Sequence, residues 1–281
     1  MEKFTQGLFV GERALYDTHD ALIEDSTFAD GESPLKESSD LVLKRCFFKW
    51  KYPLWYCTNV EVEDTTLLET ARSGIWYTKN IKMINCHISA PKTFRRADGI
   101  TLINCNLPNA LETLWNCKNI KLQKVSAQGD YFGLDAENVE IDDFCLIGNY
   151  AFDGGKNITI RNAKLDSKDS FWNCENVNVY DSIIIGEYLG WNSKNITFVN
   201  CTIDSLQGMC YMKNIKMVNC KLLNTNLCFE FCEDVDAEIN SSIDSVKNPY
   251  SGRIKAKKIN ELIMDEKYID PSKTTIEVEE K

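Results

Sequence analysis

Residues 80–88 read Asn-Ile-Lys-Met-Ile-Asn-Cys-His-Ile, and nearly the same phrase returns at residues 195–203 (Asn-Ile-Thr-Phe-Val-Asn-Cys-Thr-Ile) and 214–222 (Asn-Ile-Lys-Met-Val-Asn-Cys-Lys-Leu). The first aliphatic residue of the phrase, which we call the anchor, recurs at intervals of 19 to 21 residues. The anchors are Ala21, Leu41, Val60, Ile81, Ile100, Ile120, Val139, Ile158, Val177, Ile196, Ile215 and Val235. Self-similarity at a fixed period of this length is typical of solenoid proteins.

The pattern inside one repeat predicts strands joined by turns. The anchor and the residue two positions later are mostly aliphatic with a polar residue between them, as in Ile100-Thr101-Leu102. This alternation has the period of a β-strand. Asn or Asp precedes the anchor in most repeats and recurs four positions after it, and both tolerate the left-handed backbone conformation of turns. An aliphatic residue seven positions after the anchor indicates a second strand, and an aromatic stretch before the anchor predicts a third.

Three short strands in about 20 residues leave no room for a helix. The sequence therefore predicts an all-β fold, a single-stranded right-handed parallel β-helix of about 12 coils of 19–21 residues. A leucine-rich repeat would need helical material opposite its strand, and the drift in period breaks the strict hexapeptides of a left-handed β-helix. We expect one domain over residues 1–281, with a cap at 1–19, coils at 20–245, and an irregular coil and tail at 246–281.

Composition narrows the possible partners. The formal net charge of −10 opposes binding to a phosphate backbone, so nucleic acid is not expected as a partner. No stretch approaches the roughly 20 apolar residues of a membrane helix, and no apolar signal core follows Met1, so we expect no membrane partner and a cytoplasmic location. The 12 cysteines include no CxxC and fall mostly into two columns of the repeat, which indicates packed core thiols and no metal site. Without a P-loop or GxGxxG motif, no cofactor is expected.

The repeat resembles the pectin-lyase-like right-handed parallel β-helix superfamily, and the phrase at residues 80–86 is similar to an uncharacterised microbial β-helix family with no assigned activity. The resemblance covers nearly the whole chain. It implies the architecture, and it implies that one face binds or cleaves polysaccharide, as such solenoids often do. The sequence departs from the enzymes of the superfamily: the Asn-Thr-Asp, paired-Asp and Gly-His-Gly pattern of polygalacturonases is absent, and residues 95–98 do not match the Arg-Pro pattern of pectate lyases.

Residues at the same offset from the anchor form columns along a solenoid. The column six positions before the anchor contains no polar side chain, so we expect it to point inward. The column five before contains five of the six tryptophans together with four charged residues, and charges in a sealed core would cost several kcal/mol each. We therefore expect it to face solvent. With the columns four and eight before the anchor, which are also aromatic and polar, it forms a surface that we call the ridge.

The ridge predicts a carbohydrate or sugar-acid ligand. Sugar rings have apolar faces that stack on tryptophan and hydroxyls that bond to Asp, Asn and Arg, and the guanidinium groups of Arg95 and Arg96 suit a carboxylate or phosphate. The predicted substrate-binding residues are Trp76, Arg95, Arg96, Trp115, Trp172, Trp191, Glu112 and Tyr131. The alternative is a non-enzymatic solenoid whose ridge binds a protein partner or a second copy in a homo-oligomer, and aromatic stacking can also be purely structural.

Two carboxyls of the ridge are candidates for catalysis. Asp135 and Asp153 belong to successive coils at offsets one position apart, so we expect their Cα atoms to lie about 6 Å apart. Such a pair can serve a glycosidase, because proximity raises the pKa of one carboxyl. A basic residue beside acidic groups can instead abstract an α-proton from a uronic acid, as in a lyase or isomerase. The sequence leaves the choice between an enzyme and a binding protein open.

Overall fold

The computed structural model describes residues 1–279, which form two compact units, Met1–Leu146 (unit 1) and Ile147–Lys281 (unit 2). Both consist of β-strands, with short 3₁₀ turns at η1 (Glu69–Ala71) and η2 (Pro271–Lys273). The described strand pairings are parallel. Within the described residues, no helix has the length and apolar character needed to cross a membrane.

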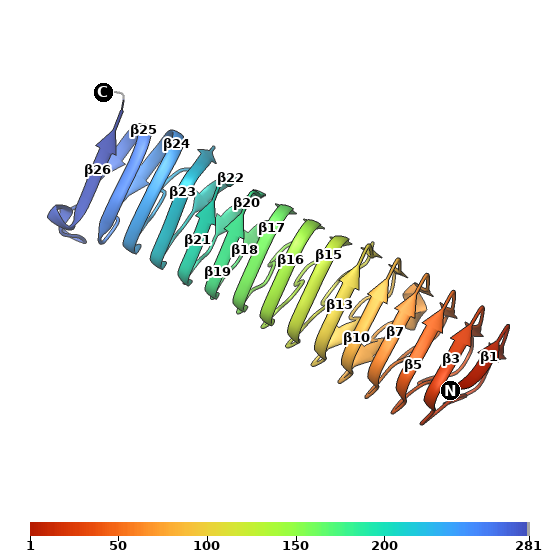
Figure 1. Ribbon diagram of the computed structural model, residues 1–281. Coiled ribbons are helices and arrows are strands. Elements are labelled where there is room, and N and C mark those ends of the chain that lie inside the picture. The colour runs from red at the N-terminus through yellow and green to blue at the C-terminus, as the bar shows by residue number, and fades with distance from the viewer. Residues whose placement is uncertain (280–281) are drawn as a thin grey trace. The chain divides into compact units, whose positions relative to one another are not determined.

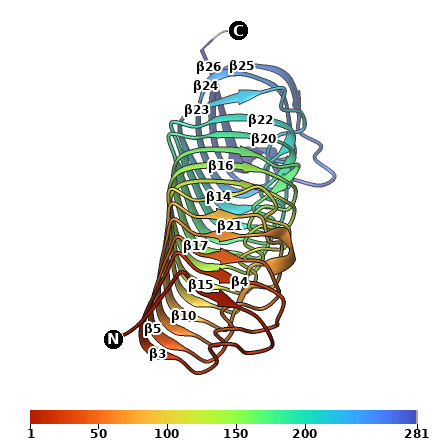
Figure 2. The ribbon, with the colours of Figure 1, turned by 90° about the vertical axis from the view of Figure 1, so that its right-hand side faces the viewer.

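Unit 1 contains two main parallel ladders, one of longer and one of short strands (Figure 1), and a separate two-stranded pairing of β9 (Ile75–Trp76) with β12 (Phe94–Arg95). The anchors stack in register, as Val60, Ile81 and Ile100 do on successive strands. The longer strands are β1 (Glu2–Thr5), β3 (His19–Glu24), β5 (Ser39–Lys44), β7 (Thr58–Glu63), β10 (Lys79–Ile84), β13 (Asp98–Ile103), β15 (Lys118–Gln128) and, at the boundary with unit 2, β16 (Glu137–Ile147). The short strands are β2 (Leu8–Phe9), β4 (Thr27–Phe28), β6 (Phe47–Phe48), β8 (Thr66–Leu67), β11 (His87–Ile88) and β14 (Asn106–Leu107), and they lie on a second face of the coil (Figure 2).

Unit 2 repeats this arrangement with longer strands toward the C-terminus. Val177, Ile196 and Ile215 stack in register. Its strands are β17 (Lys156–Asp166), β18 (Asp169–Ser170), β19 (Glu175–Tyr180), β20 (Ile183–Leu189), β21 (Lys194–Val199), β22 (Thr202–Gly208), β23 (Lys213–Leu223), β24 (Glu233–Lys247), β25 (Gly252–Ile263) and β26 (Thr274–Val278).

The fold is the predicted all-β, right-handed parallel β-helix, with about 15 turns within the described residues where the sequence predicted about 12. The additional turns lie at the two ends. Glu2 pairs with Ala21, Gly252 with Val235, and Thr274 with Gly252, each in parallel register. These three anchor positions are occupied by Glu2, Gly252 and Thr274, which are not aliphatic, so the repeat pattern did not predict these turns. Part of the predicted cap at 1–19 thus forms β1 and β2, and most of 246–279 continues the coils as β24, β25 and β26.

The prediction of a third strand in each coil is confirmed in part. The strand is present as β9 (Ile75–Trp76), β12 (Phe94–Arg95) and β18, as the ends of β20 and β22 that pair through Tyr188 and Gln207, and as two isolated bridges, Arg95 with Trp115 and Cys228 with Val246. These pieces are short because the backbone at the columns eight and four before the anchor often adopts positive φ, for example +56° at Lys92 and +50° at Arg96. Two left-handed residues so close together leave an extended piece too short for a regular strand.

The core follows the predicted columns. Every residue six positions before an anchor from Leu35 to Phe229 is buried, and the anchors are buried as well. The rings of Phe9, Phe28 and Phe48 stack along the interior at centroid separations of 4.9 and 4.6 Å. Eleven of the 12 cysteines are buried and all are free thiols. Burial raises the pKa of the Cys57 and Cys117 thiols to about 12 each.

Thiol reactivity tests this packing. Cys145, on β16, is the one exposed cysteine of the chain. Because the thiolate is the reactive form and burial suppresses it, we expect a disulfide reagent such as DTNB to titrate about one thiol in the native protein and all 12 in denaturant. The variant Cys145→Ser should abolish the fast phase. Rapid reaction of several thiols in native protein would show that the two cysteine columns are not packed in the core.

Candidate functional site

In unit 1 the ridge contains a stack of three indoles and one guanidinium, which we call the cationic stack: Trp55, Trp76, Arg95 and Trp115. The rings of Trp55 and Trp76 are stacked 5.2 Å apart at an interplanar angle of 9°. The Arg95 guanidinium carbon lies 4.6 Å from the Trp76 ring centroid and 4.5 Å from that of Trp115. Both faces of Arg95 are therefore covered, as are both faces of Trp76. These contacts are cation–π interactions that hold the guanidinium at a defined place.

The indole N–H groups of the stack donate hydrogen bonds to backbone carbonyls of the protein. Trp76 donates to the Lys92 carbonyl at 2.8 Å and Trp115 donates to the Tyr131 carbonyl at 2.7 Å. Each indole thus bridges to the following turn of the coil. Because the faces of Trp76 are covered and its N–H is engaged, only the edge of this indole is open to a ligand. The flat stacking geometry on which the prediction for Trp76 was based is not available in this conformation.

The cations beside the stack share one carboxylate. Lys92 Nζ and Arg95 Nη2 both lie 3.1 Å from Glu112 Oε2. The Nε of Arg95 is buried and makes no hydrogen bond within the described residues. Arg96 is exposed, lies 5.9 Å over the Tyr77 ring and donates to the Tyr77 hydroxyl at 3.4 Å, and among residues 1–279 it forms no ion pair. Two of the cations here, Lys92 and Arg95, therefore share a single carboxylate.

The other predicted residues of unit 1 lie next to the stack. Tyr131 makes an edge contact with Trp115 at 6.3 Å, and 38% of its surface is exposed. Asp135 is also exposed and accepts a hydrogen bond from Asn116 Nδ2 at 3.1 Å. Unit 1 thus brings together Trp76, Arg95, Trp115, Glu112 and Tyr131 through direct contacts.

Unit 2 contains a second series of rings, which we call the aromatic track: Trp172, Trp191, Tyr211 and Phe231. Successive centroids are 5.9, 4.9 and 5.5 Å apart, and the planes are tilted by 36° to 44°. Trp172 donates its indole N–H to the Tyr188 carbonyl at 3.2 Å. Trp191 and Tyr211 are 38% and 46% exposed. Asp153 accepts a hydrogen bond from Asn173 Nδ2 at 2.9 Å.

The predicted catalytic pair divides between the two units, with Asp135 in unit 1 and Asp153 in unit 2. Each carboxyl has an asparagine donor in its own unit, and each donor lies four positions before its anchor, in the same column as Asp135. A neutral amide donor stabilises an ionised carboxylate without supplying a proton. The carboxyl separation that would define a glycosidase pair stays a prediction.

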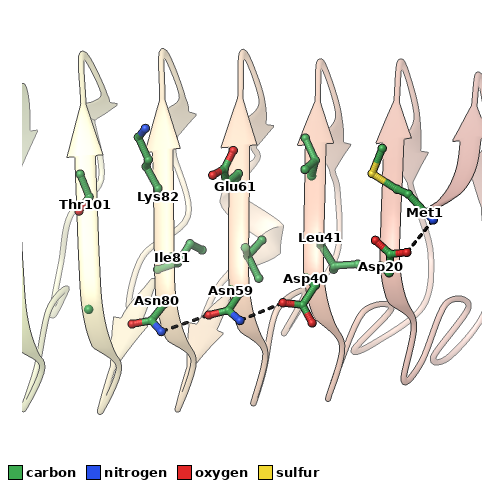
Figure 3. Close-up of a pocket in the computed structure, with 13 residues that line it drawn as sticks. Met1, Asp20, Asp40, Leu41, Asn59, Glu61, Asn80, Ile81, Lys82 and Thr101 are labelled. Atoms are coloured by element: carbon green, nitrogen blue, oxygen red, sulfur yellow. Dashed lines mark hydrogen bonds and ion pairs between the residues drawn. The ribbon is translucent and has the colours of Figure 1, made fainter.

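A broad hollow over β3, β5, β7, β10 and β13 has a volume of about 570 Å³ (Figure 3). The turn residues along its edge are paired with one another. Asn80 donates to Asn59 at 3.1 Å, Asn59 donates to Asp40 at 2.9 Å, and the N-terminal ammonium of Met1 lies 2.6 Å from Asp20. These amides occupy left-handed positions, as the sequence predicted for turn residues. The polar turn residues at this hollow therefore bond to one another and serve the structure of the turns.

Asp169, on β18 of unit 2, was not among the predicted site residues. Only 2% of its surface is exposed, and its Oδ1 has no hydrogen-bond partner among residues 1–279. It stands opposite Tyr188 on β20, beside the ion pair of Lys168 and Glu187. Desolvation raises the pKa of Asp169, and Lys168 opposes this shift. The sequence signal that could have identified Asp169 is its position eight before the anchor, in a column where tyrosines are common.

The variant Asp169→Asn tests this assignment through stability. A raised pKa means that the folded state binds the proton more tightly than the unfolded chain. The stability contribution of this group is therefore greatest below the ordinary aspartate pKa of about 3.9 and is lost as the pH rises through the raised value. We expect Asp169→Asn to be more stable than the parent at pH 7, by on the order of 1 kcal/mol, with the difference vanishing near pH 4.

Urea denaturation at several pH values measures this difference, and Asp166→Asn, at an exposed carboxyl on β17, is the control. A parent protein that is more stable than Asp169→Asn at pH 7 would contradict the assignment.

Within residues 1–279, no three His, Cys, Asp or Glu side chains are grouped so as to hold a metal ion.

Three solved structures illustrate what the chain is similar to. HetL, a pentapeptide repeat protein of the cyanobacterium Nostoc sp., is 9% identical with a TM-score of 0.30, over 81% of this chain and 90% of that one. PfbA, a surface adhesin of Streptococcus pneumoniae, is 12% identical with a TM-score of 0.38, over 98% and 83%. The A-module of the Azotobacter vinelandii mannuronan C-5 epimerase AlgE4 is 8% identical with a TM-score of 0.28, over 98% and 88%. At this level of identity no activity is transferred from them.

No curated protein matches the sequence. One family model does match, over residues 2–277, and its description is "Protein of unknown function (DUF3737)". Because the match spans almost the whole repeat region and both ends, the chain belongs to the DUF3737 family.

Proposed function

We propose that the chain binds carbohydrate through the ridge, with a preference for acidic sugars at the cationic stack of unit 1. The observation that carries the proposal is the charge balance there. Lys92 and Arg95 share Glu112 as their acceptor, and Arg96 is exposed on Tyr77 without an ion-pair partner among residues 1–279. The exposed Arg96 guanidinium, which lies over the Tyr77 ring, suits the carboxylate of a uronic acid, which it can grip through two N–H groups.

The mode of binding differs from flat stacking on tryptophan. Since the faces of Trp76 are covered, the stack acts as a rigid support that fixes Arg95, and Arg96 beside it is left to contact the ligand. Preorganised cations lose little entropy on binding. The proposal therefore expects acidic oligosaccharides to bind unit 1 better than neutral ones.

Calorimetric titration with oligogalacturonate tests the proposal. We expect Arg96→Ala to weaken binding about tenfold, which corresponds to the loss of one charge-assisted contact. The matched control is Arg13→Ala, because Arg13 also lies over a tyrosine ring, Tyr16, at 5.4 Å in unit 1 but is far from the stack in sequence. Equal loss in both variants, or the absence of any binding by the parent protein, would refute the proposed site.

The second part of the proposal is that the protein also converts the bound ligand chemically. If the bound oligosaccharide is cleaved or isomerised, Asp135 and Asp153 are the proposed catalytic carboxyls. Asp135→Asn and Asp153→Asn should then each abolish product formation while preserving affinity, because asparagine keeps the shape of the side chain and removes its proton chemistry. If product still forms after both substitutions, Asp135 and Asp153 are not the catalytic residues.

A further inference from the structure

The connection between β25 and β26 forms a hollow of about 580 Å³ in unit 2, which we call the C-terminal hollow. In Figure 2 this connection projects beyond the turns of unit 2. Its wall comes from Tyr250 and Ser251 before β25 and from residues 266–270 and Lys273 after it. The repeat pattern did not predict a site at these residues, because the repeat shortens to 17 residues between Val235 and Gly252 and the columns lose their phase.

Two tyrosines of the hollow meet on the last ring of the aromatic track. Tyr250 lies 5.3 Å from Phe231 with its plane tilted by 35°, and Tyr268 makes an edge contact with Phe231 at 6.3 Å and 70°. Tyr268 is 63% exposed and Tyr250 is 38% exposed. Unlike Trp76, whose faces are covered by Trp55 and Arg95, Tyr268 has no face-to-face partner among the described rings. It therefore offers an open aromatic face in a concave setting.

The rim of the hollow carries both hydrogen-bond donors and hydrogen-bond acceptors. The side chains of Glu266, Lys267 and Lys273 make no hydrogen bond or ion pair with residues 1–279 and are exposed. Asp270, in contrast, is committed to Ser272, whose backbone N–H and hydroxyl both donate to it. Glu233 is paired with Lys213 at 2.9 Å. The uncommitted groups are thus one acceptor and two donors around an open ring.

We propose that the C-terminal hollow binds one sugar ring of an oligosaccharide, with the Tyr268 face stacked on the ring and Glu266, Lys267 and Lys273 bonded to its hydroxyls. An exposed aromatic face takes the apolar face of a pyranose, and hydroxyls can donate to the carboxylate and accept from the ammonium groups. The rim carries both signs of charge, so this site does not require an acidic sugar, in contrast to the cationic stack. The inference rests on the proposed function for its ligand class and adds a second, independent site.

The experiment uses the full chain and two probes, maltohexaose as a neutral oligosaccharide and hexagalacturonate as an acidic one, each titrated by calorimetry. We expect Tyr268→Ala to weaken the binding of maltohexaose about tenfold, and the double variant Lys267→Ala/Lys273→Ala to weaken it to a similar extent. The matched control is Tyr16→Ala, which removes a tyrosine of unit 1 that is 40% exposed and donates to Glu37. Because Tyr268 is mostly exposed, its replacement should leave the fold intact, which circular dichroism checks.

The outcomes separate the two proposals. Loss of maltohexaose binding in Tyr268→Ala with hexagalacturonate binding unaffected supports the hollow, whatever Arg96→Ala does. Binding of both probes that is unchanged in Tyr268→Ala and in the double lysine variant overturns the hollow, and if Arg96→Ala still weakens hexagalacturonate the cationic stack stands. A parent protein that binds neither probe overturns both.

Discussion

Phe48→Ala is expected to lower the free energy of unfolding by about 3–5 kcal/mol, the cost of removing a large ring from a close-packed core. Phe48 is fully buried, and its ring stacks on Phe28 at 4.6 Å with an angle of 4°. Phe28 in turn stacks on Phe9, so the substitution opens a cavity at the end of a column of three rings, against Leu67 of the next turn. Neighbouring turns cannot close around it, because their spacing is set by the parallel strand ladders.

The neighbouring Phe47 is the matched control. It belongs to the same two-residue strand, β6, but points outward and is 48% exposed. We expect Phe47→Ala to change stability by less than about 1 kcal/mol. Urea denaturation followed by circular dichroism compares the two variants, and similar losses would show that inward and outward positions of β6 are assigned incorrectly.

Gly129→Ala is expected to destabilise the protein by about 3 kcal/mol or more, because its Cβ meets backbone that cannot move aside. The added atom would lie 2.4 Å from the Leu111 nitrogen and 2.5 Å from the Ala110 carbonyl carbon, in the adjacent turn. That turn is held close by the hydrogen bond from Ala110 N–H to the Gln128 carbonyl at 2.6 Å. Relief of the clash requires the two turns to separate.

Gly11→Ala distinguishes this clash from ordinary backbone strain. Gly11 has a φ of +97°, yet a Cβ there meets no atom within 4 Å. The control should therefore show the conformational cost alone, on the order of 1 kcal/mol. Thermal denaturation of both variants measures the difference, and equal shifts in Tm would mean that the close approach at Gly129 has no energetic consequence.

The interior of the coils could be predicted from the sequence, because the signals there are local and repeated. The alternation around Ile100 and Ile81 indicates which side chains are buried, and the same indication returns every 19 to 21 residues. The ends could not be predicted in the same way. Glu2 and Gly252 occupy anchor positions without aliphatic side chains, since a terminal turn has a neighbour on one side only and a shortened turn changes the phase.

The sequence by itself determined the parallel β-helix, the stacking of the anchors and the surface placement of the tryptophan column. Each of these depends on hydrophobic periodicity and on turn residues such as Asn59 that tolerate a left-handed backbone. Only the tertiary structure decided how the ridge side chains use their surfaces: Arg95 inserted between Trp76 and Trp115, and Asp135 bonded to Asn116. Periodicity specifies which way a side chain points, whereas the covering of a ring face or the partner of a carboxyl depends on rotamers in the neighbouring turns.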